Sequence, residues 1–304
     1  MDRRTFVAGT AATLAAHASV PAVTPPPAVA MATRPIPRTG EELPVIGLGT
    51  WQTFDPPRRT AEALTPLEAT LLALRGAGGR VVDSSPMYGT SESIAGELAE
   101  RAGLGDALFW ATKVWTRGEA EGVRQMEESA RLLRRRRIDL LQVHNLVDWR
   151  THLATLRRWQ AEDRVRYVGV THYQTSAFAE LERIVTSERI DFVQLPYSVA
   201  VRDAEQRLLP AAHDAGVAVL VNLPFGGGGL LRRLSGEPLP TSVREWAASW
   251  PQALLKFVLA HPAVTCVIPG TGNPRHMADD AAAGTGRLPD AAERAALLRA
   301  LDMA

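Results

Sequence analysis

Four polar residues lie where three apolar, β-rich runs of the sequence end, and their types suit proton transfer to a carbonyl oxygen. They are Asp83, Tyr88, Lys113 and His144. A tyrosine ordinarily titrates near pH ~10, so an adjacent ammonium is needed to favour the phenolate and ease proton release. Lys113 can supply that charge, Asp83 can hold the lysine ionised, and His144 can polarise the carbonyl. This is half of a hydride transfer, and a cofactor must supply the rest because no side chain donates hydride.

Each of these residues also has a structural explanation when it is taken alone. An aspartate often caps a turn, a tyrosine can lie on a rim, a lysine can extend to solvent, and a histidine can bond core backbone. We favour the chemical interpretation because all four fall at the same ends of neighbouring strands. A second enzymatic alternative makes Lys113 the Schiff-base nucleophile of a barrel aldolase or lyase. A salt bridge from Asp83 argues against it by keeping the amine charged.

The elements that position these residues are short apolar runs that alternate with segments of helical period. Strands are expected at 45–49, 80–83, 108–112, 138–143, 165–170, 192–195, 217–221 and 265–268. Helices are expected at 60–76, 91–101, 118–136, 150–162, 175–187, 203–214, 246–261, 274–283 and 290–301. The run 217–221 is apolar throughout, as expected for a parallel strand buried on both faces. The alternation predicts one α/β domain with a (β/α)8 TIM barrel, whose active sites lie at the carboxyl ends of the strands.

A doubly wound open sheet is the competing architecture. It calls for a G-x-G-x-x-G turn that leads from the first strand into a helix. The sequence instead has Gly47-Leu48-Gly49-Thr50-Trp51 at that place. The barrel is therefore preferred, and the glycine run 226–229 after the seventh strand is expected to form a flexible loop.

Several sequence motifs, taken in their order along the chain, resemble those of the aldo-keto reductase family. They are Gly47-Leu48-Gly49-Thr50-Trp51, the Asp83-x4-Tyr88 spacing, the run 138–144 that ends in His144, and Ile268-Pro269-Gly270-Thr271. The resemblance covers residues 36–302. It implies an NADP(H)-dependent oxidoreductase that reduces aldehydes or ketones, with Asp83, Tyr88, Lys113 and His144 as its catalytic tetrad and Tyr88 as general acid.

The resemblance also implies a set of cofactor-binding positions, some of which depart from the family pattern. They are Gly49, Thr50, Thr171, His172, Gln194, Asn222, Phe225, Gly270, Thr271, Arg275, His276 and Asp280. Thr171 and His172 replace a Ser-Asn pair, and Asn222 stands where an aromatic residue stacks on the nicotinamide, a role left to Phe225. Gly270 and His276 replace a Lys and an Arg that meet the 2′-phosphate, and Asp280 replaces an Asn at the adenine.

These departures leave fewer charge-assisted contacts to select NADP over NAD. The resemblance to the family still implies NADP as cofactor, and NAD is the alternative. The departures also support an alternative from another class, a catalytically weak nicotinamide-nucleotide-binding sensor or scaffold on the same barrel. Trp51 and Trp115 are candidates for the substrate pocket.

Composition excludes other classes of partner. The 304 residues carry 34 basic and 33 acidic side chains, a net charge of +1, which gives no field to attract nucleic acid or an anionic membrane. The one cysteine, Cys266, forbids an intramolecular disulfide and is expected to be a buried apolar residue. The seven histidines have no metal-type spacing, so no metal is expected. The basic run 134–137 is expected to be a solvated helix end.

The first 30 residues are expected to be an export leader that precedes a barrel domain at 31–304. Arg3-Arg4 followed by Thr5-Phe6 and an Ala-rich run resembles a bacterial twin-arginine signal, which addresses folded proteins for export. The partners expected are a small carbonyl substrate and the twin-arginine export machinery, and the barrel is expected to be a periplasmic or exported monomer. A disordered Ala/Pro tail on a cytoplasmic enzyme is the alternative.

Overall fold

Eight parallel strands form the centre of the molecule, in a computed structural model that describes residues 30–302. The strands are β3 (Leu48–Gly49), β4 (Val81–Asp83), β5 (Phe109–Val114), β6 (Ile138–His144), β7 (Val165–Thr171), β8 (Phe192–Pro196), β9 (Ala218–Asn222) and β10 (Val264–Val267). They pair in chain order, and parallel bridges from Ile46 to Val267 and from Gly49 to Gly270 join the two ends. The predicted (β/α)8 barrel is confirmed. The predicted leader, apart from Ala30, lies outside the described residues.

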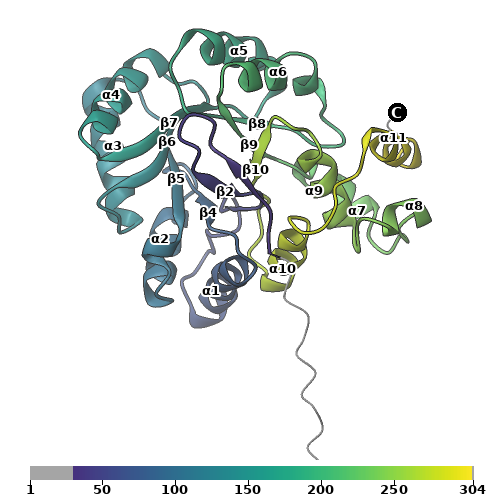
Figure 1. The fold of residues 1–304 in the computed structure, drawn as a ribbon. Helices are drawn as coiled ribbons and strands as arrows, with labels where there is room; N and C mark the ends of the chain where they lie inside the picture. The colour runs from purple at the N-terminus through teal and green to yellow at the C-terminus, as the bar shows by residue number, and fades with distance from the viewer. Residues whose placement is uncertain (1–29, 303–304) are drawn as a thin grey trace, which may run out of the picture.

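Helices surround the barrel (Figure 1). They are α1 (Ala61–Gly76), α2 (Ser91–Arg101), α3 (Glu119–Leu132), α4 (Trp149–Ala161), α5 (Phe178–Ser187), α6 (Leu208–Asp214), α7 (Gly229–Arg233), α8 (Thr241–Arg244), α9 (Trp250–Leu259), α10 (Pro274–Ala282) and α11 (Ala291–Ala300). Short 3-10 turns lie at Gly105–Ala107, Thr175–Ala177, Asp203–Glu205 and Gly226–Gly228. No helix within 30–302 is long and apolar enough to cross a membrane.

Several predicted helices have different bounds in the structure, and two of them show a clear local reason. The helix expected at 246–261 begins at Trp250, because the Ser249 side chain accepts the Gln252 backbone N–H as an N-cap and Pro251 lies in the first turn. The helix expected at 118–136 ends at Leu132, since Arg134 takes a left-handed φ of 57° that breaks the helix. Arg134 and Arg136 are exposed, as expected of a solvated helix end.

The glycine run after β9, which is expected to be a flexible loop, adopts a short 3-10 turn in the structure. Gly226, Gly227 and Gly228 have φ between 58° and 83°, a region that is open to glycine at no steric cost. They form a 3-10 turn that leads directly into α7. Helices α7 and α8 are additions to the regular βα repeat and lie at one side of the barrel (Figure 1).

An N-terminal hairpin covers one end of the barrel and is not predicted by the sequence. Strands β1 (Thr33–Pro35) and β2 (Glu42–Pro44) pair antiparallel, and Figure 1 shows them in dark purple across the barrel. Leu43 and the adjoining Ile36 are fully buried in one apolar cluster with Phe109, Leu140 and other residues of the barrel strands. The hairpin therefore closes the barrel interior against water.

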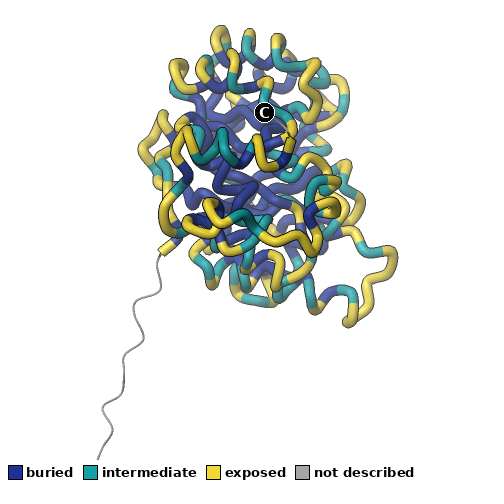
Figure 2. The backbone as a smooth tube through the Cα atoms, turned by 90° about the vertical axis from the view of Figure 1, so that its right-hand side faces the viewer, coloured by how far each residue is buried: buried dark blue, intermediate teal, exposed yellow. Residues whose placement is uncertain are grey.

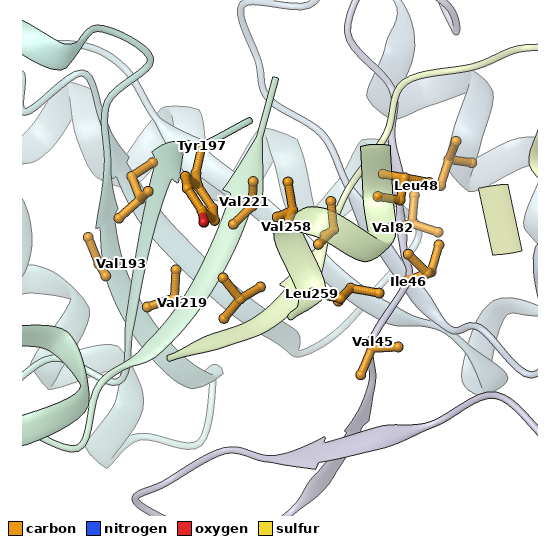
Figure 3. Packing of buried hydrophobic residues seen from close by; sticks show 14 of the residues in the cluster. Val45, Ile46, Leu48, Val82, Val193, Tyr197, Val219, Val221, Val258 and Leu259 are labelled. Carbon is orange, nitrogen blue, oxygen red and sulfur yellow. The ribbon is translucent and has the colours of Figure 1, made fainter. Parts of the chain in front are cut away.

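Buried residues lie at the centre of the molecule (Figure 2), and their apolar side chains form two clusters, one inside the barrel and one under the helices. Along β9, Ala218 and Leu220 belong to the inner cluster, whereas Val219 and Val221 pack with the residues under the helices. Figure 3 shows the outer cluster, in which Val219 and Val221 lie near Val258 of α9. This alternation explains why the run 217–221 is apolar at every position. Cys266 is buried in the inner cluster, as expected.

We predict that Leu43→Ala lowers the free energy of unfolding by about 3 kcal/mol, because it leaves a cavity beneath the barrel. Leu43 is 0% exposed, whereas Leu72 on α1 is 49% exposed and offers a matched control. Leu72→Ala should change stability by no more than about 0.5 kcal/mol. Urea denaturation of both variants measures the difference, and equal losses would show that the hairpin does not seal the core.

Candidate active site

A cleft of about 1320 Å³ opens at the carboxyl ends of the barrel strands. Three predicted catalytic residues, Asp83, Tyr88 and His144, are among its lining residues. Most of the predicted cofactor and substrate positions line it too: Gly49, Thr50, Thr171, Gln194, Asn222, Phe225, Gly270, Thr271, His276, Asp280, Trp51 and Trp115. The cleft lies at the end of the barrel where the sequence analysis placed the site.

A buried ion pair lies beneath the cleft. Lys113 on β5 is 0% exposed, and its Nζ donates to Asp83 Oδ2 at 2.5 Å and to the Ser84 carbonyl oxygen at 2.7 Å. Burial alone would lower the pKa of Lys113, but the Asp83 carboxylate and Tyr88 outweigh it, so the pKa is raised and the amine stays charged. A charged amine is a poor nucleophile, which counts against the Schiff-base alternative.

Two amides hold the other oxygen of Asp83, and one of them was not singled out by the sequence analysis. Gln194 Nε2 donates to Asp83 Oδ1 at 2.9 Å, and Gln142 Nε2 donates to the same oxygen at 3.3 Å. Gln142 is fully buried on β6, two residues before His144. Side chains alternate between the two faces of a strand, so Gln142 and His144, two residues apart, point to the same side of β6. This spacing was the signal for Gln142 that the sequence offered.

Tyr88 lies between the buried lysine and the histidine. Lys113 Nζ is 4.9 Å from the centroid of the Tyr88 ring, and the His144 ring meets it edge-on with centroids 5.8 Å apart. Burial raises the pKa of Tyr88, and the charge of Lys113 offsets this only in part, so the net pKa is raised. Lys113 therefore acts on Tyr88 in the expected direction, toward the phenolate, but burial outweighs it. Tyr88 rests as a neutral phenol, which is the form that can give a proton.

His144 is a neutral imidazole at the end of β6. Burial, followed by the charge of Lys113, lowers the pKa of His144 to about 2. Its Nδ1 lies 3.0 Å from Ser85 Oγ, so Nε2 is the ring nitrogen available to a ligand in the cleft. A neutral imidazole there can hydrogen-bond a carbonyl oxygen without adding a formal charge.

The remaining amides of the cleft form a short chain. Gln194 Oε1 accepts from Thr171 Oγ1 and from Asn222 Nδ2, each at 3.2 Å. Asn222 Oδ1 is buried and has no hydrogen-bond partner within residues 30–302. A buried acceptor without a donor is costly.

Two predicted cofactor positions are not brought into the cleft lining. His172 accepts the Gln174 backbone N–H at Nδ1, and its ring stacks on Tyr173 with centroids 5.6 Å apart. Arg275 is exposed in the first turn of α10, where Asn273 caps the helix. Within residues 30–302 no group of three or more His, Cys, Asp or Glu side chains could hold a metal ion.

Asp280 is a buried carboxyl at the α10 side of the cleft, on the same helix face as His276 one turn earlier. Burial, with a smaller contribution from Asp279, raises the pKa of Asp280 to about 8. The neutral acid therefore predominates near pH 7. In this form it offers both a donor and an acceptor, as the asparagine found in the family would.

A (β/α)8 barrel with a polar cleft at the carboxyl ends of its strands is the architecture of many enzymes. Comparison with known proteins identifies the family. The model of the aldo/keto reductase family matches residues 45–295, and the chain belongs to this family. The chain is 27% identical to "Aldo-keto reductase YhdN" of Bacillus subtilis (strain 168) over 198 residues. That alignment covers 60% of the chain and 59% of YhdN, so the chain spans less than two thirds of this relative.

Two further proteins show longer similarity. The "NADH-specific methylglyoxal reductase" of Escherichia coli (strain K12) is 25% identical over 240 residues, covering 69% of the chain and 72% of that protein. The crystal structure of an aldo/keto reductase from Klebsiella pneumoniae in complex with NADP and acetate superposes with a TM-score of 0.72 and 26% identity, covering 86% of this chain and 92% of the other.

We predict that Asp83→Asn lowers the free energy of unfolding at pH 7 by about 3 kcal/mol, because it leaves Lys113 buried without its counter-charge. Glu121→Gln is the control, since it breaks an exposed ion pair with Arg124 and should cost less than about 0.5 kcal/mol. Urea denaturation measures both. An Asp83→Asn protein as stable as the control variant would contradict the role given to the pair.

Proposed function

We propose that the protein is an NADP(H)-dependent oxidoreductase that reduces aldehydes or ketones to alcohols, with Tyr88 as general acid. The observation that carries the proposal is a neutral phenol in the cleft, beside the charged amine of Lys113 and the neutral imidazole of His144. Family membership supports the same reaction class, and the similar Klebsiella structure was solved with NADP.

The residues of the cleft fit a nicotinamide dinucleotide. The amide residues Asn222 and Gln194 and the hydroxyl residue Thr171 line the cleft and suit the carboxamide of a nicotinamide. The N-terminus of α10 carries a positive partial charge that suits a phosphate, and Gly270 and Thr271 of the preceding segment line the cleft. Asp280 and His276 lie farther along α10 and would hold the adenosine end. The cofactor would supply the hydride for the carbonyl carbon.

The chain's own residues supply the proton and stabilise the charge that develops. The carbonyl oxygen accepts hydrogen bonds from the Tyr88 hydroxyl and from His144, and both polarise the C=O bond. As the carbon gains hydride, the C=O π electrons move to oxygen, which takes the Tyr88 proton and becomes a hydroxyl. The tyrosinate left behind is stabilised by Lys113, which Asp83 keeps charged and in place. Solvent returns the proton to Tyr88 before the next cycle.

We predict that Tyr88→Phe lowers kcat for reduction of a simple aromatic aldehyde by at least about 100-fold, because the proton donor is lost. Turnover is measured as the loss of absorbance of NADPH, and in a parallel assay as the loss of absorbance of NADH. Tyr167→Phe is the matched control, since it removes a tyrosine hydroxyl bonded to Glu41, under the barrel and away from the cleft. Undiminished turnover in Tyr88→Phe would discard the role of Tyr88.

We predict that NADP binding weakens as pH rises through about 8. Asp280 is protonated below that pKa and becomes an anion above it, where it repels the phosphates of the cofactor. The dissociation constant should rise roughly fivefold between pH 7 and pH 9, equivalent to about 1 kcal/mol. Asp280→Asn should flatten this rise. Fluorescence titration at each pH measures it, and an identical rise in the variant would exclude Asp280 as the titrating group.

A further inference from the structure

A buried carboxyl group outside the cleft has no part in the proposed reaction. Glu92 lies on α2, four residues after Tyr88, and is only 2% exposed. Its Oε1 accepts a hydrogen bond from Thr112 Oγ1 on β5, and its Oε2 accepts one from Ser129 Oγ on α3 at 3.1 Å. Both of these hydroxyl residues are fully buried. The Glu92 carboxylate therefore links α2 to the strand and to the helix that follow it in the chain.

One end of this link lies beside Lys113. Thr112 directly precedes Lys113 on β5, and successive side chains of a strand point to opposite faces. Ala111 belongs to the inner cluster and Val114 to the outer one. By the same alternation, Lys113 points into the barrel and Thr112 points toward the helices. The bond from Thr112 to Glu92 therefore holds, from its outer side, the segment of β5 that carries the lysine.

The other end of the link is close to Tyr88 along the chain. The Ser91 N–H donates to the Tyr88 carbonyl oxygen at 3.1 Å, which joins the Tyr88 turn to the first turn of α2, where Glu92 lies. On the inner side of β5, Lys113 Nζ lies 4.9 Å from the centroid of the Tyr88 ring. The Glu92 link thus ties together, from the helix side, the two segments whose side chains meet at the catalytic centre.

A carboxylate is a costly choice for this position. Burial raises the pKa of Glu92 to about 6. Hydrogen bonds from Thr112 and Ser129 oppose this rise. The charge of Lys113 also opposes it, and the charge of Glu128 on α3 adds to it. Apolar side chains of the same shape are often as stable as a buried polar network or more stable, so the geometry that Glu92 imposes explains its presence better than stability does.

We propose that Glu92 is a positioning residue, which holds the Tyr88 ring and the Lys113 ammonium at the separation that proton transfer needs. The proposal rests on the proposed function, in which Lys113 stabilises the tyrosinate that forms at Tyr88. A displacement of reacting groups by about 1 Å can cost about 100-fold in rate, so loss of the link lowers kcat. Glu92 is not among the residues that line the cleft, so the binding of cofactor and carbonyl compound stays unchanged.

The test compares variants of the full-length protein. Glu92→Gln keeps the shape, and its amide can bond both hydroxyls. A triple variant, Glu92→Met with Thr112→Val and Ser129→Ala, removes the link and leaves neither hydroxyl without a partner, so it should be as stable as the wild type. Thr112→Val alone breaks only the bond on β5 and tests the same point if the triple variant does not fold. Glu97→Met, which removes an exposed ion pair with Arg59 from the same helix, is the control.

We expect kcat for an aromatic aldehyde with NADPH to fall about tenfold in the triple variant and about threefold in Thr112→Val. KM for the aldehyde and Kd for NADP should stay within about twofold of the wild type, and Glu92→Gln and Glu97→Met should also keep kcat within about twofold. Wild-type kcat in the triple variant, or a parallel loss of cofactor affinity, would overturn the proposal. An equally large loss of kcat in Glu92→Gln would do the same, because it would assign the effect to the charge and not to the link.

Crystal structures of the same proteins separate this proposal from the proposed function. The distance from Lys113 Nζ to the centroid of the Tyr88 ring, 4.9 Å in the wild type, should change by about 0.5 Å or more in the triple variant and stay the same in Glu92→Gln. An unchanged distance in the triple variant would overturn the positioning role. If the distance changes but NADPH reduces no carbonyl compound even with the wild type, the proposed function fails and the positioning role stands.

Discussion

The contact between Lys113 and Asp83 is the interaction on which the rest of the site depends. Removing two charges from water is costly, and their attraction offsets that cost only when the remaining polar atoms are also bonded. Here the Ser84 carbonyl oxygen accepts a second hydrogen bond from Lys113, while Gln142 and Gln194 donate to the other oxygen of Asp83. These groups lie on β4, β5, β6 and β8 or directly follow one of them. Four of the eight barrel strands therefore contribute to the ion pair or hydrogen-bond to it.

The low-dielectric surroundings of the cleft shift the pKa values of Tyr88 and His144 in opposite directions. Burial disfavours the charged form of each group, so it raises the pKa of Tyr88 and lowers that of His144. The charge of Lys113 opposes burial at the tyrosine and reinforces it at the histidine. The result is one neutral phenol and one neutral imidazole, which in the proposed reaction would give a proton to the developing alkoxide and hydrogen-bond to it. Such preorganisation stabilises a charge that exists only during the reaction.

The sequence was sufficient for the features that depend on local pattern. Buried parallel strands are continuous apolar runs, so all eight barrel strands were placed to within a few residues, and polar residues at their ends marked the cleft. The sequence did not predict the hairpin β1–β2, because its strands have three residues each and end in Pro35 and Pro44. Gln142 escaped because its amide does not titrate and its partner lies 59 residues away. The orientation of His172 depends on its stacking with Tyr173, which no periodicity encodes.

One departure from the family pattern, Asn222 in place of an aromatic residue, adds an amide to the hydrogen bonds of the cleft. Asn222 donates to Gln194, and Gln194 donates to Asp83, so the hydrogen bonds run in one direction from the cleft surface to the buried ion pair. The outer end of this chain is Asn222, which lines the cleft. Hydrogen bonds in series polarise one another in a low-dielectric interior. A ligand contact at Asn222 would therefore reach the carboxylate that holds Lys113 charged, with no movement of the backbone required.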